Sequence, residues 1–208
     1  VDDGKGFDFV IPLAFLEKVD RLLEKRGIND AVFLAAICPG SGHKTKCWTK
    51  EGFIELSKFL ISELNASIVI IGDTDDRSIG EAIKKSLGSS VFNFCGELSI
   101  MESAALISKC GLVISNDAGP LHIAEALNKK VVALFGPTVE EFGYFPVNTR
   151  SVVVQRMLRC RPCSNNGWRS CYKKTNECIE SITPKDVINA CMGLLHNTSE
   201  DNQKEINI

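Results

Sequence analysis

Two glycine-containing turns in this sequence carry residue types that bind phosphate groups. The first, Pro39–Lys46, reads PGSGHKTK and offers two glycines, two hydroxyls and two lysines. Glycine lets the backbone approach an anion closely, and lysine and hydroxyl groups bind phosphate oxygens. The run is not a P-loop, because that motif needs glycine directly before the lysine and His43 stands there. On its own it fits a phosphate site and a solvated turn equally well.

The second turn, Ser115–His122, reads SNDAGPLH and follows a short apolar run. We expect a helix to begin at Pro120, since proline suits the first helical position. The free N–H groups and positive dipole end of such a helix favour a pyrophosphate, and His122 could donate to phosphate or sugar. Two simpler interpretations compete with this one: a lone histidine is more often structural, and Asp117 could do no more than cap the helix.

Two further turns carry polar groups. In Gly72–Arg77 a carboxylate could accept hydrogen bonds from ribose hydroxyls, or the acidic residues could only shape the turn and cap the next helix. In Phe135–Glu141 a Gly-Pro pair forces a turn, and Thr138 adds a hydroxyl.

Nine cysteines stand in this chain. Their odd number and the lack of a secretory signal lead us to expect mostly reduced thiols in a cytoplasmic protein. Five of them lie in apolar segments and are expected to be small buried residues: Cys38, Cys47, Cys95, Cys110 and Cys191. The other four follow a C-x2-C-x7-C-x6-C spacing, which fits one structural zinc ion, local disulfides or free thiols: Cys160, Cys163, Cys171 and Cys178.

The composition is that of one globular domain. The chain has 208 residues, 44% hydrophobic and 24% charged, which is enough apolar material to bury a core. No run of 18 or more uninterrupted apolar residues occurs, so no membrane-spanning helix is expected. The net charge of −2 gives no electrostatic reason to expect nucleic-acid binding.

Short apolar runs alternate with amphipathic stretches along the chain. The runs are apolar at successive positions, which is typical of strands buried on both faces of a parallel sheet. They are Ala31–Cys38, Ser67–Ile71, Val91–Cys95, Leu112–Ser115, Lys130–Phe135 and Ser151–Gln155. This order predicts an α/β fold with a doubly wound, right-handed parallel sheet, whose ligands bind at the carboxyl ends of the strands.

Helix start signals precede the stretches between the strands. Thr49 is expected to cap a helix that runs to about Leu64, and Ser99 forms a capping box with Glu102. Further helices are expected over Pro12–Arg26 and after Thr183-Pro184. The polar tail after about His196 is expected to be frayed.

Together these runs resemble the two signatures of glycosyltransferase family 9, the ADP-heptose:lipopolysaccharide heptosyltransferases. One is Ser115–Pro137 followed by Thr138, and the other is Cys38–Trp48; the Cys-x-Pro-Cys at Cys160 also occurs in many members. The resemblance implies a GT-B fold of two Rossmann-like domains that face each other across a cleft. This chain would be the C-terminal half, with an interdomain segment and helix over 1–30, a donor-binding domain over 31–196 and a disordered tail over 197–208. The N-terminal acceptor domain would be absent.

The resemblance also implies roles for individual residues. Lys46 would contact the donor diphosphate, with Ser41 and Gly42 in the same pocket. Asp76 would lie near the ribose, and Leu98 against the adenine. The residues around the diphosphate and sugar would be Asp117, Ala118, Gly119 and His122. Ala118 stands where several members have Thr or Ser, which removes one hydroxyl contact.

The implied reaction is an inverting displacement of ADP by an acceptor hydroxyl. The general base would lie in the absent half, so no catalytic residue is assigned to this chain. Lys46 and the helix N-terminus would stabilise the leaving ADP without a required cofactor. Replacing Lys46 and His122 by alanine would then abolish nucleotide binding without changing the melting temperature.

The implied partners are ADP-heptose or a related nucleotide sugar and, through the absent half, the lipopolysaccharide core. The enzyme would be cytoplasmic, at most peripheral at the inner membrane. Two alternatives stay open: another nucleotide-sugar transferase or epimerase of the same architecture, and a non-enzymatic module held together by zinc.

Overall fold

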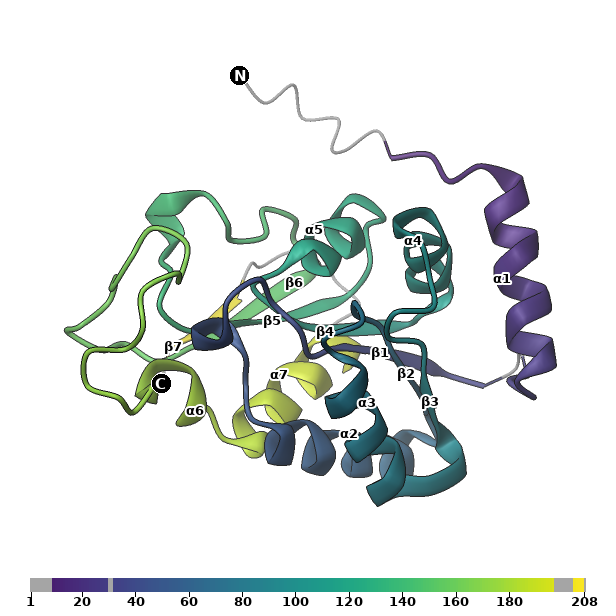
Figure 1. The fold of residues 1–208 in the computed structure, drawn as a ribbon, viewed down its shortest axis with the longest axis horizontal. Coiled ribbons are helices and arrows are strands. Elements are labelled where there is room, and N and C mark those ends of the chain that lie inside the picture. The colour runs from purple at the N-terminus through teal and green to yellow at the C-terminus, as the bar shows by residue number, and fades with distance from the viewer. Residues whose placement is uncertain (1–8, 30–31, 197–203, 208) are drawn as a thin grey trace.

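A computed structural model describes residues 9–29, 32–196 and 204–207 of the chain. The core element is one sheet with the strand order β3-β2-β1-β4-β5-β6-β7, in which every neighbouring pair is parallel (Figure 1). The strands are β1 (Leu34–Cys38), β2 (Ser67–Ile70), β3 (Val91–Asn93), β4 (Leu112–Asn116), β5 (Val131–Phe135), β6 (Ser151–Gln155) and β7 (Lys204–Asn207). The predicted doubly wound parallel sheet is confirmed.

Helices cover both faces of the sheet. On one face lie α1 (Leu13–Lys25), α4 (Ile100–Lys109) and α5 (Gly119–Ala126). On the other lie α2 (Lys50–Leu64), α3 (Arg77–Leu87) and α7 (Pro184–His196), with the short α6 (Glu177–Glu180) beside them. Strands enclosed in this way are buried on both faces: all five residues of β1, β4 and β5 are buried. This explains why continuous apolar runs marked the strands.

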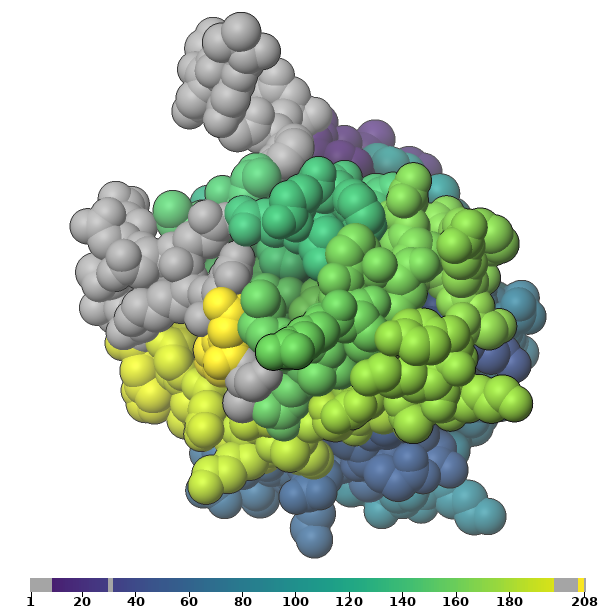
Figure 2. All heavy atoms as spheres, turned by 90° about the vertical axis from the view of Figure 1, so that its left-hand side faces the viewer, coloured from purple at the N-terminus to yellow at the C-terminus, as the bar shows by residue number. Residues whose placement is uncertain are grey.

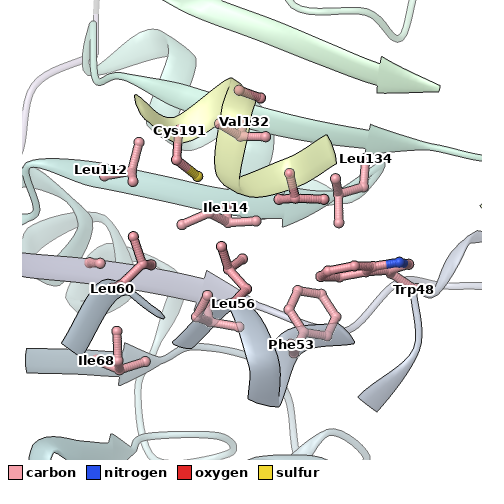
Figure 3. Packing of buried hydrophobic residues seen from close by; sticks show 14 of the residues in the cluster. Trp48, Phe53, Leu56, Leu60, Ile68, Leu112, Ile114, Val132, Leu134 and Cys191 are labelled. Carbon is pink, nitrogen blue, oxygen red and sulfur yellow. The ribbon is translucent and has the colours of Figure 1, made fainter. Parts of the chain in front are cut away.

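Two hydrophobic clusters fill the space between sheet and helices. One joins the sheet to α2 and α7 through residues such as Leu56, Ile114 and Cys191 (Figure 3). The other joins the opposite face of the sheet to α1, α4 and α5. In the described part of the chain, no helix is both long and apolar enough to cross a membrane.

The helix start signals act as predicted. Thr49 accepts a hydrogen bond from the Gly52 N–H at 3.1 Å, and Thr183 exchanges hydrogen bonds with Asp186 at the start of α7. One boundary differs: α5 begins at Gly119, so Pro120 takes its second position. Proline fits there as well, because that N–H has no partner within the helix either.

The C-terminal tail differs from the expectation. Residues 204–207 form β7 and pair with Val152–Gln155 of β6, so the predicted disorder over 197–208 is wrong for this part. Residues 197–203 and 208 lie outside the described chain. A strand forms here because the unpaired backbone groups of β6 offer a template that does not depend on side-chain polarity. Ile206 packs against the core, and Gln155 donates to Asn207 at 3.0 Å.

The capping box of α4 gives a pH-dependent prediction. Glu102 accepts from the Ser99 N–H at 2.7 Å and pairs with Lys18 of α1. Hydrogen bonds from Lys18 and Ser99 lower the pKa of the Glu102 carboxyl from 4.5 to about 2. A carboxyl whose pKa falls on folding stabilises the fold above its unfolded pKa, and this stability is lost as the pH falls through the folded value. We expect Glu102→Gln to lower the free energy of unfolding by about 1 kcal/mol at pH 7.

The difference between Glu102→Gln and the parent should shrink as the pH falls from 4.5 toward 2, measured by urea denaturation. Glu55→Gln, at an exposed position of α2, is the matched control for the loss of one charge. A difference that stays constant over this range would contradict the prediction.

Candidate functional site

The carboxyl ends of the parallel strands meet at one edge of the sheet, and the site residues gather at its middle. There β1 lies between β2 and β4, so the chain winds outward in opposite directions from this point. Cys38 and Ser115 are neighbours in the sheet, which brings the turn after β1 beside the turn after β4. Such a switch point is where doubly wound sheets bind ligands. Figure 2 looks onto this edge, where segments after β5 and β6, in green, cover much of the face.

A buried ion pair joins the two turns. The Lys46 ammonium lies 3.0 Å from the Asp117 carboxylate, with side-chain exposures of 11% and 3%. Thr138, in the turn after β5, donates to the same carboxylate oxygen at 2.7 Å. Ser41 donates to the Asp117 backbone carbonyl at 2.9 Å. Ser41, Lys46 and Asp117, which the sequence placed in one pocket, therefore do lie together.

Hydrogen bonds and packing hold the turn after β1 against the end of β4. The Asn116 side chain donates to the Pro39 carbonyl at 2.6 Å and accepts from the Trp48 N–H at 3.1 Å. Trp48 is buried, and its indole N–H donates to the Ile182 carbonyl at 2.8 Å. Lys46 thus lies between Pro39 and Trp48, the two residues of the turn that Asn116 holds by hydrogen bonds.

The N-terminus of α5 opens beside this pair. Ala118 occupies the N-cap position without a side-chain hydrogen bond, so Asp117 does not cap the helix; its carboxylate goes to Lys46 instead. Gly119 is exposed, and among the described residues, its own chain and helix neighbours aside, no atom lies within 4 Å of the place where a side chain would begin. Gly42 is equally open. A ligand can therefore approach the backbone of both turns closely.

His122 stands on the first turn of α5. Its ring is 45% exposed, and Nδ1 lies 3.7 Å from the buried Glu125 carboxylate. Burial raises the pKa of Glu125, but the nearby His122 ring and the hydrogen bonds from the Val147 and Asn148 N–H groups outweigh it and leave that pKa lowered. Glu125 thereby ties His122 to the loop before β6. Within the described chain, no hydrogen bond or ion pair joins His122 to Lys46.

Asp76 and Leu98 lie along the edge on the side of β2 and β3. Side chains built onto Gly40 and Gly72 would begin 2.0 and 2.4 Å from an Asp76 carboxylate oxygen, so this carboxylate fills the space that both glycines leave. It also accepts from the Asp73 N–H at 3.1 Å, and partial burial raises its pKa. Leu98 packs, partly buried, against the hydrophobic cluster on the face of the sheet that α1, α4 and α5 cover.

The charge at the expected diphosphate site differs from what the sequence indicated. Lys46 was expected to contact the donor diphosphate, and in the structure the Asp117 carboxylate pairs with its ammonium. Thr138 joins the pair without having been assigned to it, although its hydroxyl stood out in the Gly-Pro turn. The Tyr144 ring centroid lies 5.6 Å from the Lys46 ammonium. No sequence pattern predicted this contact, because it depends on how two distant segments fold together.

The cysteines are free thiols. Cys38, Cys95, Cys110 and Cys191 are buried as expected, whereas Cys47 is half-buried. For the four clustered cysteines, nothing in residues 9–29, 32–196 or 204–207 forms a group of three or more His, Cys, Asp or Glu arranged to hold a metal ion. Burial raises the pKa of the Cys178 thiol to about 11. Zinc at these four cysteines stays a prediction.

A hollow of about 400 Å³ lies beside the site rather than within it. It is lined by the end of β6 and by residues that follow β5 and β6: Val139, Glu140, Glu141, Phe142, Gln155, Met157, Leu158, Arg161 and Pro162. Arg161 donates to the Thr138 carbonyl at 2.6 Å, which connects this hollow to the ion pair.

The fold and the edge site define a doubly wound α/β domain with a polar switch-point site. The family model of glycosyltransferase family 9 (heptosyltransferase) matches residues 17–172, about three quarters of the chain. This protein belongs to that family.

Curated relatives point the same way. Lipopolysaccharide heptosyltransferase 2 of Escherichia coli K12 is 32% identical over 167 residues, which are 78% of this chain and 47% of that protein. Lipooligosaccharide heptosyltransferase 2 of Haemophilus influenzae is 29% identical over 144 residues, 67% of this chain and 39% of that protein. This chain thus spans less than half the length of these relatives.

Solved structures share the fold. The glycosyl transferase family 9 protein of Veillonella parvula superposes with a TM-score of 0.79 at 23% identity, over 94% of this chain and 56% of that one. E. coli ADP-heptose lps heptosyltransferase II gives a TM-score of 0.72 at 24% identity, over 90% and 53%.

Proposed function

We propose that this chain is the donor-binding half of a heptosyltransferase of lipopolysaccharide core biosynthesis and binds ADP-heptose or a related nucleotide sugar. The observation that carries the proposal is the buried group of Lys46, Asp117 and Thr138 beside the open N-terminus of α5. Family membership supports the same reaction class. Two structures of similar fold were solved with ADP or with ADP-D-beta-D-heptose.

The ion pair suits a diphosphate in a specific way. Asp117 compensates the Lys46 charge, and the ammonium keeps hydrogen-bonding capacity for a phosphate oxygen, since lysine has three donors. The α5 N-terminus adds free N–H groups and a positive dipole end, which favour an anion. His122 and the backbone at Gly42 and Gly119 would complete the contacts. As ADP leaves, these groups would stabilise its growing negative charge.

Transfer needs groups that this chain does not supply in our proposal. The acceptor hydroxyl would be deprotonated by a carboxylate of the other half, which would also bind the lipopolysaccharide core. Asp76 and Leu98 would contact the ribose and adenine of the donor. We place the reaction in the cytoplasm, in keeping with nine free thiols.

Calorimetric titration with ADP tests the proposal. We expect heat of binding and protection from thermal unfolding at millimolar ADP, with UDP and GDP weaker. His122→Ala should weaken ADP binding about tenfold, as expected for one lost hydrogen bond to a charged group.

His196→Ala is the matched control. His196 is exposed at the end of α7, where Leu195 lies beside Lys130 before β5, at the opposite edge of the sheet. It should bind ADP like the parent. Absence of both heat and thermal protection in the parent chain would refute the proposal, and stronger binding of UDP or GDP would point to a different nucleotide sugar.

A further inference from the structure

Gly167 lies directly against the Lys46 side chain. It belongs to the segment after β6, 121 residues further along the chain. A side chain at Gly167 would begin 2.8 Å from Lys46 Cγ, 3.1 Å from Cε and 3.3 Å from Cδ. Gly167 itself is buried, and its φ of +84° lies in the left-handed region that favours glycine. This position therefore requires glycine for two separate reasons.

A hydrogen bond also holds Gly167 against the turn that carries Lys46. The Thr45 hydroxyl donates to the Gly167 carbonyl, so the residue next to Lys46 holds the backbone of Gly167 in place. The methylene chain of Lys46 is thus enclosed along its length, while Asp117 holds its ammonium. A lysine restricted in this way loses less side-chain entropy when it binds a ligand, because little freedom remains to be lost.

We propose that Gly167 is a positioning residue of the site: the missing side chain lets the segment after β6 close onto Lys46 and hold its ammonium against Asp117. Its consequence for donor binding rests on the proposed function. No local sequence pattern marks Gly167, since the contact depends on how two distant segments pack.

Substitutions at Gly167 and Gly27 separate the steric contact from backbone strain. Gly27, which follows α1, has a similar φ of +72°, and the N–H groups of Gly27 and Ile28 bond back to the Glu24 and Leu23 carbonyls, the pattern of a helix that ends on a left-handed residue. Among the described residues other than its chain neighbours, no atom lies within 4 Å of the place where its side chain would begin. Alanine at Gly27 therefore introduces only strain, and asparagine, which tolerates the left-handed region better, should recover most of the loss. At Gly167 both alanine and asparagine must displace Lys46.

In urea denaturation, we expect Gly167→Ala to raise the unfolding equilibrium constant about tenfold more than Gly27→Ala, as overpacking does. Gly167→Asn should give no recovery. Acylation of the Lys46 amine, followed by mass spectrometry, should be several-fold faster in the Gly167 variants only. Recovery by asparagine at Gly167, or unchanged Lys46 acylation, would overturn the inference.

The ADP titration distinguishes failure of this inference from failure of the proposed function. We expect both Gly167 variants to bind ADP about tenfold more weakly than the parent, and both Gly27 variants to match it. Parent-like ADP affinity in the Gly167 variants would overturn the positioning role. If the parent binds no ADP, the proposed function fails, while the acylation and unfolding results still decide whether Gly167 positions Lys46.

Discussion

Replacing Lys46 with methionine should lower the free energy of unfolding by about 3–5 kcal/mol, the cost of leaving one partner of a buried ion pair uncompensated. Without Lys46, the Asp117 carboxylate would stay 3% exposed with Thr138 as its remaining side-chain donor. Urea denaturation at pH 7 measures the change. This expectation replaces the one from the sequence, in which alanine at both Lys46 and His122 abolishes nucleotide binding but leaves the melting temperature unchanged.

Two comparisons make the test specific. Lys44→Met removes an exposed lysine from the same turn and should change stability by less than about 0.5 kcal/mol. Lys46→Met combined with Asp117→Asn should cost clearly less than the sum of the single substitutions, since the double variant leaves no unpaired charge. Equal effects of Lys44→Met and Lys46→Met would show that the ion pair contributes nothing to stability.

Trp48→Ala should also cost about 3–5 kcal/mol, the range for large aromatic residues removed from a core. Trp48 is 2% exposed and meets Phe53 edge to face, with ring centroids 5.0 Å apart (Figure 3). Its loss would also free the Ile182 carbonyl from its indole donor. Because Trp48 anchors the turn that carries Lys46, ADP affinity should fall together with stability.

The second tryptophan of the chain is a natural control. Trp168 is 59% exposed, so Trp168→Ala should change the free energy of unfolding by less than about 0.5 kcal/mol. Far-UV circular dichroism in urea follows both variants independently of tryptophan fluorescence. Similar losses in the two variants would argue against Trp48 as an anchor of the core.

Local patterns carried most of the fold. Apolar runs predicted six strands, because burial on both faces of the sheet requires apolar residues at successive positions. Thr49, Ser99 and Thr183 predicted the starts of α2, α4 and α7, because helix capping depends on residues only a few positions apart. β7 left no such mark. Its pairing depends on the free edge of β6, which a polar sequence such as Lys204–Asn207 does not reveal.

The site was predictable in part. Ser41, Lys46 and Asp117 come together as expected, because parallel strands place the turns after β1 and β4 at one edge. The spacing of the four cysteines left zinc, local disulfides and free thiols open, because spacing along a chain does not fix where side chains point; in the structure they are free thiols.

By itself, the sequence determined the alternation of strands and helices, the family and the turns that carry polar chemistry, because these depend on neighbouring residues. Only the tertiary structure decided that Lys46 is neutralised by Asp117, that Thr138 shares this carboxylate and that Gly167 encloses the lysine side chain. The physical reason is that charge compensation and close packing depend on distances between segments far apart in the chain, and folding alone sets those distances.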